Sequence, residues 1–243
     1  AVAAARAGAQ VTLVAHIGQD NFGKQTLIGL QKEGIDTSKI FAETDFPSGV
    51  AFVLVDAQGE NSIVVAPSAN AALLPGHIEA VKSSFSCADI CLLQLEIPLE
   101  TVSYSISLAT KHNLPVILNP APAQKLPRKI LSELFLLTPN ETEVEILTGI
   151  RPNTDKDAIK AAKILQAQGV KTVLITLGAR GSLLVTELEI YRLPTFPVKV
   201  KDSTAAGDAF NGALAYSLGS GVPFKKAIRF ASCAGALAVT QLG

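Results

Sequence analysis

Short apolar runs alternate along the chain with longer segments in which apolar residues recur at helical spacing. This alternation is typical of an α/β protein whose mostly parallel central sheet is flanked by helices. The runs that predict core strands span residues 11–17, 89–93, 116–118, 134–137 and 172–176. The segments that predict the intervening helices span residues 22–33, 99–112 and 155–168.

One region, at about residues 47–67, breaks the alternation. Residues 49–55 and 62–66 are rich in β-forming side chains, and the polar stretch 56–60 joins them, so they predict a hairpin and not a βαβ unit. A hairpin inserted in a parallel α/β core is often a lid or an interaction edge. Two further β-type runs, residues 182–186 and 189–193, follow a glycine-bearing loop.

Composition narrows the class of protein. The 243 residues fit one domain, and 21 Lys+Arg balance 21 Asp+Glu. This balance gives no electrostatic signature of a nucleic-acid or anionic membrane partner. The longest uncharged stretch, residues 61–78, contains Pro67 and Pro75 and predicts no membrane-spanning helix. The three cysteines form no CxxC pair, which favours a reducing compartment, and we expect a cytoplasmic location.

Metal-binding side chains show no pattern in the sequence. His16, His77 and His112 are scattered, and none is spaced from a cysteine or an acid as zinc ligands are. Cys87 and Cys91 stand four apart, but a strand is predicted to begin between them, which favours buried structural thiols. No zinc site is predicted.

The run from Asp202 to Leu214, DSTAAGDAFNGAL, carries the strongest chemical signal. Small residues open a predicted helix, so an anion can approach the backbone N–H groups at the positive end of its dipole. Asp208 would repel such an anion, which makes sense if its carboxylate accepts a proton from an attacking hydroxyl. The alternative is that Asp208 is a favourable first-turn residue and that the small residues serve packing.

This run resembles the second signature of the ribokinase-like (PfkB) family of sugar kinases at every position. Further blocks resemble the family in order along the chain. They are GQDNFG at residues 18–23, QLE at 94–96, NPAPA at 119–123, TPNETE at 138–143 and ITLGARG at 175–181. The NPAPA run and SANAAL at 68–73 point to the ribokinase subgroup. The resemblance implies a single three-layer, Rossmann-like PfkB domain over residues 1–243 with a small lid hairpin.

The resemblance also implies roles for the residues of these blocks. Asp208 is similar to the general base, and the backbone of Ala205, Ala206 and Gly207 to the anion hole for the transferring phosphoryl group. Glu96 is expected to bind the sugar, although a solvated acid at the end of a strand is the alternative. The implied reaction is phosphorylation of D-ribose at O5 by ATP, and the lid hairpin implies a homodimer.

For ATP, the resemblance implies a second group of residues. They are Asn140, Thr176, Leu177, Gly178, Ala179, Arg180, Gly181, Gly207, Asp208 and Ser232. Each has a structural alternative: Asn140 is a suitable helix N-cap, residues 176–181 could be a simple glycine turn, and Ser232 could lie on a helix-packing surface.

Two cations are implied by the same resemblance. Glu143, on the same predicted helix face as Asn140, is expected near Mg²⁺, through water. The residues expected to hold an activating K⁺ are Asp202, Thr204, Ala238, Gln241 and Gly243.

Residues 1–9 and 224–243 predict helices that run to the ends of the chain. We therefore expect both ends to lie inside a longer protein, with the family's first strand, its GGKGxN sugar-binding run and a C-terminal tail outside this sequence. The expectation leaves the activity of this chain alone open, including nucleotide binding without efficient catalysis.

Two other classes of protein fit the sequence less well than a sugar kinase does. A Rossmann dehydrogenase needs a GxGxxG turn after its first strand, and none occurs. A non-catalytic binding module would have no use for Asp208 beside an anion site. Deoxyribose, fructose and nucleoside kinases of the same family remain open as alternatives.

Overall fold

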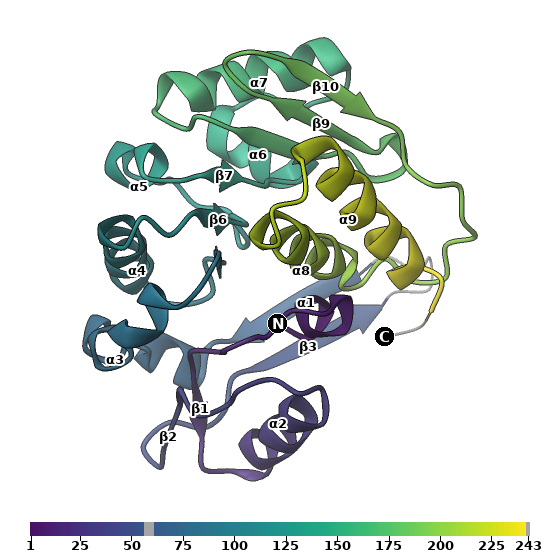
Figure 1. The fold of residues 1–243 in the computed structure, drawn as a ribbon. Coiled ribbons are helices and arrows are strands. Elements are labelled where there is room, and N and C mark those ends of the chain that lie inside the picture. The colour runs from purple at the N-terminus through teal and green to yellow at the C-terminus, as the bar shows by residue number, and fades with distance from the viewer. Residues whose placement is uncertain (56–60, 242–243) are drawn as a thin grey trace.

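A six-stranded sheet forms the centre of the computed structural model, which describes residues 1–55 and 61–241 (Figure 1). Its strand order is β10-β9-β8-β7-β6-β5. The strands are β5 (Cys91–Leu93), β6 (Val116–Leu118), β7 (Leu136–Leu137), β8 (Val173–Thr176), β9 (Ser182–Val185) and β10 (Ile190–Leu193). Strands β5 to β8 run parallel, while β9 and β10 add antiparallel.

Side chains alternate between the two faces of this sheet and so divide the core in two. Val116 and Leu118 belong to one buried cluster, and Ile117 between them belongs to the other. The first face is covered by α4 (Leu99–Lys111), α5 (Arg128–Ser132), α6 (Glu141–Thr148) and α7 (Asp155–Ala167). The second is covered by α8 (Ala206–Gly219) and α9 (Phe224–Ala238). The three-layer α/β fold with a mostly parallel sheet is therefore confirmed.

The prediction of a core strand over residues 11–17 was wrong. Strand β1 covers only Ala15–Gly18 and pairs in parallel with β2 (Ile40–Glu43), outside the six-stranded sheet. Upstream of β1, Thr12 makes a single bridge to Asp36. The segment that contains Asp36 then turns, because the Asp36 side chain accepts the N–H of Ser38 at 2.8 Å. This turn interrupts the pairing of the two segments between residue 12 and strand β1.

Helices near the two ends are shorter than the sequence predicted. Helix α1 spans Val2–Ala7 and packs against α8. Helix α9 ends at Ala238 because the carbonyl of Val239 accepts the N–H groups of Lys201 and Asp202. These two bonds tie the loop before α8 to the end of α9.

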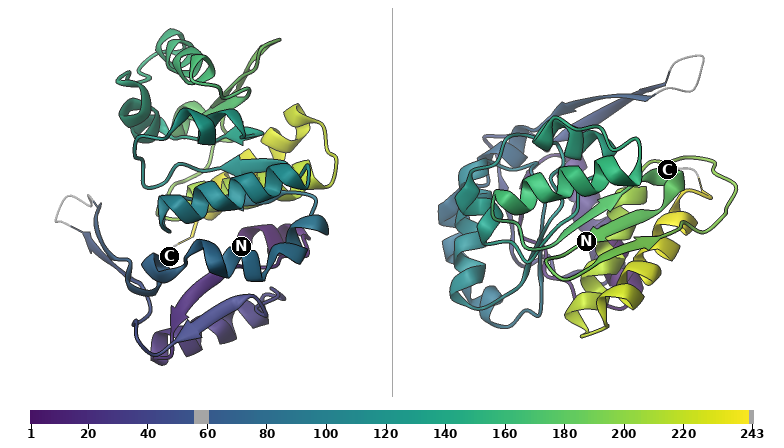
Figure 2. Two further views of the ribbon diagram at one scale, coloured as in Figure 1. Left: turned by 90° about the vertical axis from the view of Figure 1, so that its left-hand side faces the viewer. Right: turned by 90° about the horizontal axis from the view of Figure 1, so that it is seen from above.

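The predicted hairpin is confirmed as β3 (Val50–Val55) and β4 (Asn61–Ala66), paired antiparallel from Val50 opposite Ala66 to Val55 opposite Asn61. Its connecting residues 56–60 lie outside the described residues. The hairpin reaches out from the body of the molecule (Figure 2). Short helices lead back to the core: η1 (Ser68–Ala72), α3 (Pro75–Ala80) and η2 (Lys82–Ser86).

The GQDNFG block anchors the base of the hairpin. Asp20 caps α2 (Asn21–Lys32) by accepting the N–H of Gly23 at 2.8 Å. The same carboxylate accepts the hydroxyl and the N–H of Ser48, at 2.8 and 2.7 Å. A Cβ atom at Gly18 would lie 2.5 Å from the backbone nitrogen of Ser48, so this close approach needs glycine. Within the part of the chain that the structure describes, no helix is both long and apolar enough to cross a membrane.

Candidate active site

A cleft of about 200 Å³ opens at the carboxyl ends of the parallel strands, beside the N-terminus of α8. This is the edge at which open α/β sheets bind ligands. Its lining residues are Gln94, Glu96, Asn119, Ala121, Thr138, Asn140, Glu143, Thr176, Ala205, Gly207, Asp208 and Asn211. Elements far apart in sequence thus bring the predicted catalytic, sugar and phosphate residues into one cleft.

The N-terminus of α8 faces the cleft without a side-chain cap. Ala205 occupies the N-cap in the left-handed region, with φ 58° and ψ 8°, and its methyl group cannot accept a hydrogen bond. A Cβ atom at Gly207 would meet no heavy atom within 4 Å, so packing does not require this glycine. The uncapped end and the open space are suited to an anionic ligand.

Asp208 lies exposed in the first turn of α8, and a residue that follows a strand of the sheet donates a hydrogen bond to it. The side-chain amide of Gln94, which follows β5, donates to Asp208 Oδ1 at 3.1 Å. Glu96 lines the same cleft, and desolvation together with the negative charge of Asp208 raises its pKa. The two acids are therefore close enough to interact, as a base and a substrate ligand at one site would be.

Asn140 and Glu143 form a closed pair at the start of α6. The Asn140 side chain accepts the N–H of Glu143 at 2.8 Å, and the Glu143 carboxylate accepts the N–H and the amide of Asn140 at 2.8 and 2.9 Å. The N-cap alternative for Asn140 is confirmed, and both residues still line the cleft. Burial raises the pKa of Glu143 and so favours its neutral form. A cation bound nearby would lower this pKa and favour the charged form.

A chain of buried polar side chains forms the floor of the cleft. Asn119, Thr138 and Asn211 are 7%, 1% and 5% exposed. The Thr138 hydroxyl donates to Asn211 Oδ1 at 2.7 Å, and Asn211 Nδ2 donates to the carbonyl of Gly207 at 2.9 Å. Asn119 Nδ2 donates to the carbonyl of Thr138 at 3.1 Å. No role was predicted for these three residues or for Gln94, although all four lie within the runs that carry the resemblance.

The predicted nucleotide loop begins in the cleft and leaves it. Thr176 lines the cleft, whereas the Leu177 side chain is buried in the core. Gly178 has φ +51°, and a Cβ atom there would lie 3.8 Å from the carboxylate of Glu141, which places the loop beside the start of α6. Gly181 packs beneath β10, where a Cβ atom would lie 2.1 Å from the carbonyl oxygen of Leu193.

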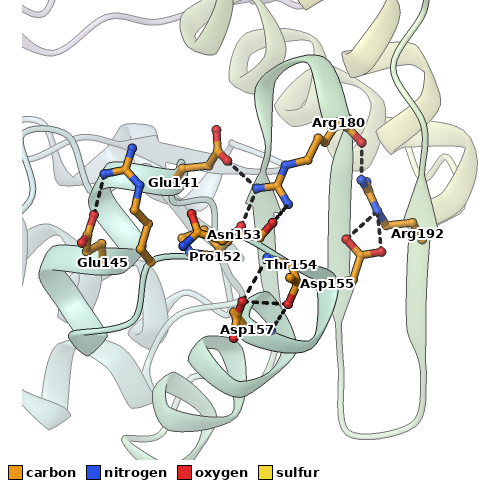
Figure 3. Close-up of polar contacts among 10 residues, drawn as sticks. Glu141, Glu145, Pro152, Asn153, Thr154, Asp155, Asp157, Arg180 and Arg192 are labelled. Carbon is orange, nitrogen blue, oxygen red and sulfur yellow. Dashed lines mark hydrogen bonds and ion pairs between the residues drawn. The ribbon is translucent and has the colours of Figure 1, made fainter.

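The guanidinium of Arg180 points toward Glu141 and the segment between α6 and α7 (Figure 3). Its guanidinium pairs with Glu141 and donates to the carbonyls of Pro152 and Asn153 between α6 and α7. Its own carbonyl accepts a hydrogen bond from Arg192. In this structure the side chain of Arg180 therefore holds the loop to its neighbours, and neither Arg180 nor Ala179 is among the cleft-lining residues.

The last predicted nucleotide residue, Ser232, is buried on α9 and does not line the cleft. Helix α9 packs closely on α8, where a Cβ atom at Gly235 would lie 3.3 Å from the carbonyl oxygen of Ala206. Ser232 thus lies in the helix that supports the N-terminal end of α8.

Four of the residues predicted to hold K⁺ lie where one loop meets the end of α9. Asp202 Oδ1 accepts the N–H and hydroxyl of Thr204 at 2.8 and 2.7 Å. Ala238 accepts the N–H of Gln241 at 3.2 Å, and the neighbouring Val239 carbonyl binds residues 201 and 202. Gly243 lies outside the described residues.

The fold also brings together histidines that are distant in sequence. His16, Glu43 and His77 have side-chain ligand atoms within 4.8 Å of one another, and both ring nitrogens of the buried His16 have no hydrogen-bond partner among the described residues. However, His77 Nδ1 accepts the N–H of Leu74 at 2.9 Å, so the ring proton of neutral His77 lies on Nε2, the atom that faces Glu43. This arrangement does not suit metal ligation by His77.

A family model described as "pfkB family carbohydrate kinase" matches residues 1–243. The chain belongs to the pfkB family of carbohydrate kinases. Like other members of the pfkB family, it is a phosphotransferase that acts on an alcohol group.

Three relatives illustrate where this pfkB kinase stands in its family. A ribokinase of Haemophilus influenzae is 41% identical over 243 residues, which is all of this chain and 79% of that protein. A deoxyribokinase of Salmonella typhi is 36% identical over 96% of this chain and 78% of that protein. The structure of Arabidopsis thaliana ribokinase complexed with ribose and ATP matches with a TM-score of 0.94 and 30% identity, over all of this chain and 80% of that one.

Proposed function

We propose that this pfkB kinase transfers the γ-phosphoryl group of ATP to O5 of D-ribose, giving D-ribose 5-phosphate and ADP. The observation that carries the proposal is the position of Asp208 in a cleft beside an uncapped helix N-terminus, with Glu96 in the same cleft. The similarity to ribokinases, one of them complexed with ribose and ATP, supports the choice of substrates.

In this proposal each group has a defined task. Asp208 accepts the proton of the sugar hydroxyl as the sugar oxygen attacks the γ-phosphorus and ADP leaves. Gln94 donates to Asp208 Oδ1, and Oδ2 is the oxygen that accepts this proton. Glu96 binds the sugar. The N–H groups of Ala205, Gly207 and Asp208 face the phosphoryl group, whose negative charge is stabilised by the end of the helix. The N–H of Ala206, which was also predicted for the anion hole, instead donates to the carbonyl of Ser203 at 3.3 Å.

ATP lies, in the proposal, between the cleft and the loop at residues 176–181, with Asn140 near its phosphates and Ser232 behind its base. The residues that line the cleft fit Mg²⁺ bound through water, because both Glu143 oxygens already accept hydrogen bonds from Asn140 and its carboxylate remains beside the cleft. Mg²⁺ would supply positive charge to the phosphates of ATP when bound.

Activation by K⁺, a homodimer and a cytoplasmic location are further parts of the proposal. The contact of the Asp202 loop with the end of α9 supports a K⁺ site built from Asp202, Thr204, Ala238, Gln241 and Gly243. Phe52, Val64 and Val65 are exposed on the hairpin, which supports pairing with a second copy. The three cysteines are free thiols, as expected in a reducing compartment.

The test is ADP release from MgATP in K⁺ buffer, measured with D-ribose, 2-deoxy-D-ribose, D-fructose, adenosine or no acceptor. We expect the highest kcat/KM with D-ribose and a product that carries phosphate on O5. The deoxyribokinase relative makes 2-deoxy-D-ribose the most demanding competitor. A higher kcat/KM for any other acceptor, or release that does not depend on the acceptor, would overturn the assignment.

A further inference from the structure

The N-terminal turn of α8 has no side-chain cap, but one of its peptide carbonyl groups accepts a hydrogen bond from a side chain of the next turn. The amide of Asn211 donates to the carbonyl oxygen of Gly207 at 2.9 Å. This carbonyl shares a planar peptide group with the N–H of Asp208, and in a trans peptide the two point in opposite directions. Fixing the Gly207 oxygen therefore also fixes the direction in which the Asp208 N–H points, out of the helix end.

Asn211 is itself fixed by Thr138. The carbonyl of Gly207 can only accept, so Asn211 Nδ2 faces it and Oδ1 faces Thr138. The Thr138 hydroxyl donates to this Oδ1 at 2.7 Å, which is much closer than its other acceptor, the carbonyl of Leu118 at 3.4 Å. Both side chains are almost fully buried, which makes the two bonds costly to lose. Asn119 in turn donates to the backbone carbonyl of Thr138 and holds this residue at the end of β7.

The three donors run in one direction. The Thr138 hydroxyl donates to the Asn211 carbonyl, the Asn211 amide donates to the Gly207 carbonyl, and the Asp208 N–H on that same peptide is the next donor. Hydrogen bonds in such a series polarise one another, most strongly in a low-dielectric interior.

We infer that Thr138 and Asn211 are positioning residues that orient and polarise the Asp208 N–H toward the phosphoryl group in the transition state. The inference rests on the proposed function, because it takes the end of α8 as the place where this group is stabilised. Neither residue needs to touch the substrate: both act through the Gly207 peptide. Charge on the phosphoryl oxygens is redistributed as transfer proceeds, so the effect belongs to kcat more than to the binding of ATP or D-ribose.

The test compares variants that keep the shape and remove one bond. Thr138→Val removes the hydroxyl and should lower kcat about 10- to 100-fold, less than the roughly 10²–10³-fold loss when an oxyanion-hole donor itself is removed. KM for MgATP and D-ribose should stay within about threefold. Thr138→Ser keeps the hydroxyl and should recover most of kcat.

Thr101→Val is the matched control. Thr101 is also fully buried, and its hydroxyl donates to the carbonyl of Leu73 at 2.7 Å, outside the cleft lining. This variant should lose a similar amount of thermal stability while kcat stays unchanged. If Thr138→Val misfolds, Asn211→Leu removes the same link with a side chain of similar size and should show the same loss of kcat. Equal kcat in the Thr101 and Thr138 valine variants, or no rescue by serine, would overturn the inference.

A second readout needs no sugar. Calorimetry with MgADP plus aluminium fluoride, a mimic of the transferring group, should show about tenfold weaker binding in Thr138→Val, with binding of MgADP alone unchanged. If the wild type prefers another acceptor, D-ribose is not the substrate, and the kinetic comparison of the variants is made with that acceptor. If the mimic binds equally well to both proteins, the inference falls and the proposed substrate is unaffected.

Discussion

Gly207 lies in the first turn of a helix, and a side chain at this position would enter open space at the cleft. Gly212, one turn and a half further along the same helix, is different: a Cβ atom there would lie 2.7 Å from that of Ala3. Two glycines of α8 thus serve different purposes. One permits helix packing, and the other leaves room for a ligand.

Gly207→Ala should therefore fold normally, with a melting temperature equal to or above that of the wild type, because alanine is the better helix former. Its kcat should fall by about 10²-fold, the order expected when reacting groups are displaced by about 1 Å. Gly212→Ala should show the reverse pattern, with a lower melting temperature from overpacking. Thermal unfolding and steady-state kinetics measure both effects, and a Gly207→Ala enzyme with wild-type kcat would contradict the role given to this glycine.

Residues of the site differ in how far the sequence could predict them. Asp208 and its small neighbours stand in one continuous run, so the sequence alone could place them together at the start of one helix. Gln94 and Thr138 reach Asp208 and Asn211 across 114 and 73 residues, and only the folded sheet shows which partners they have. The partner of Arg180 could not be predicted from the sequence either, because Glu141 lies 39 residues away; nucleotide binding by the loop of Arg180 stays a prediction.

Among the elements, the lid hairpin depends on a connection that lies outside it. Asp20 joins the start of α2 to Ser48, two residues before β3 begins. The hydrogen bonds from Gly23 and Ser48 lower the pKa of Asp20. A carboxyl group whose pKa is lower in the folded state stabilises the fold above its unfolded pKa, about 3.9, and loses this effect as pH falls through the folded value.

Asp20→Asn should thus lower the melting temperature at neutral pH and speed protease cleavage near Ser48. The difference from the wild type should begin to shrink below about pH 4 and should disappear as pH falls through the lowered pKa of the folded state, where the wild-type carboxyl becomes neutral. Asp36→Asn is the control, because Asp36 accepts a hydrogen bond from Ser38 within its own turn and, among the described residues, makes no hydrogen bond to the base of the hairpin. If the difference in melting temperature stays constant as the pH is lowered through the pKa of Asp20, the charge of Asp20 is not the cause.

The boundaries of helices and strands could be predicted where the element's own residues set them, but not where contacts with distant segments set them. The strand at residues 116–118 was predicted to the residue, because it is apolar on both faces and buried in the parallel sheet. Strand β2 was missed, since its short Ile40–Glu43 segment has no clear alternation and is defined by its pairing with β1. The early end of α9 depends on bonds from residues 201 and 202, which no helical pattern could indicate.

At the scale of the whole molecule, the site is a consequence of topology. Parallel strands β5 to β8 end at one edge, so the polar residues that follow them converge there. Helix α8 packs on the face opposite to α4 and α7, and its N-terminus reaches the same edge. The fold class and the location of the cleft could be predicted from the alternation and the motifs, whereas the hydrogen-bonded floor beneath α8 required the packing of distant segments.

If Asp208 is the base for phosphorylation of D-ribose, its loss should lower the rate of D-ribose-dependent ADP release from MgATP. We expect kcat of Asp208→Asn to fall by about 10²–10⁴-fold, the range for loss of a general base, with melting temperature and nucleotide affinity close to the wild type. Ribose-dependent release by Asp208→Asn at the wild-type rate would show that Asp208 is not the base.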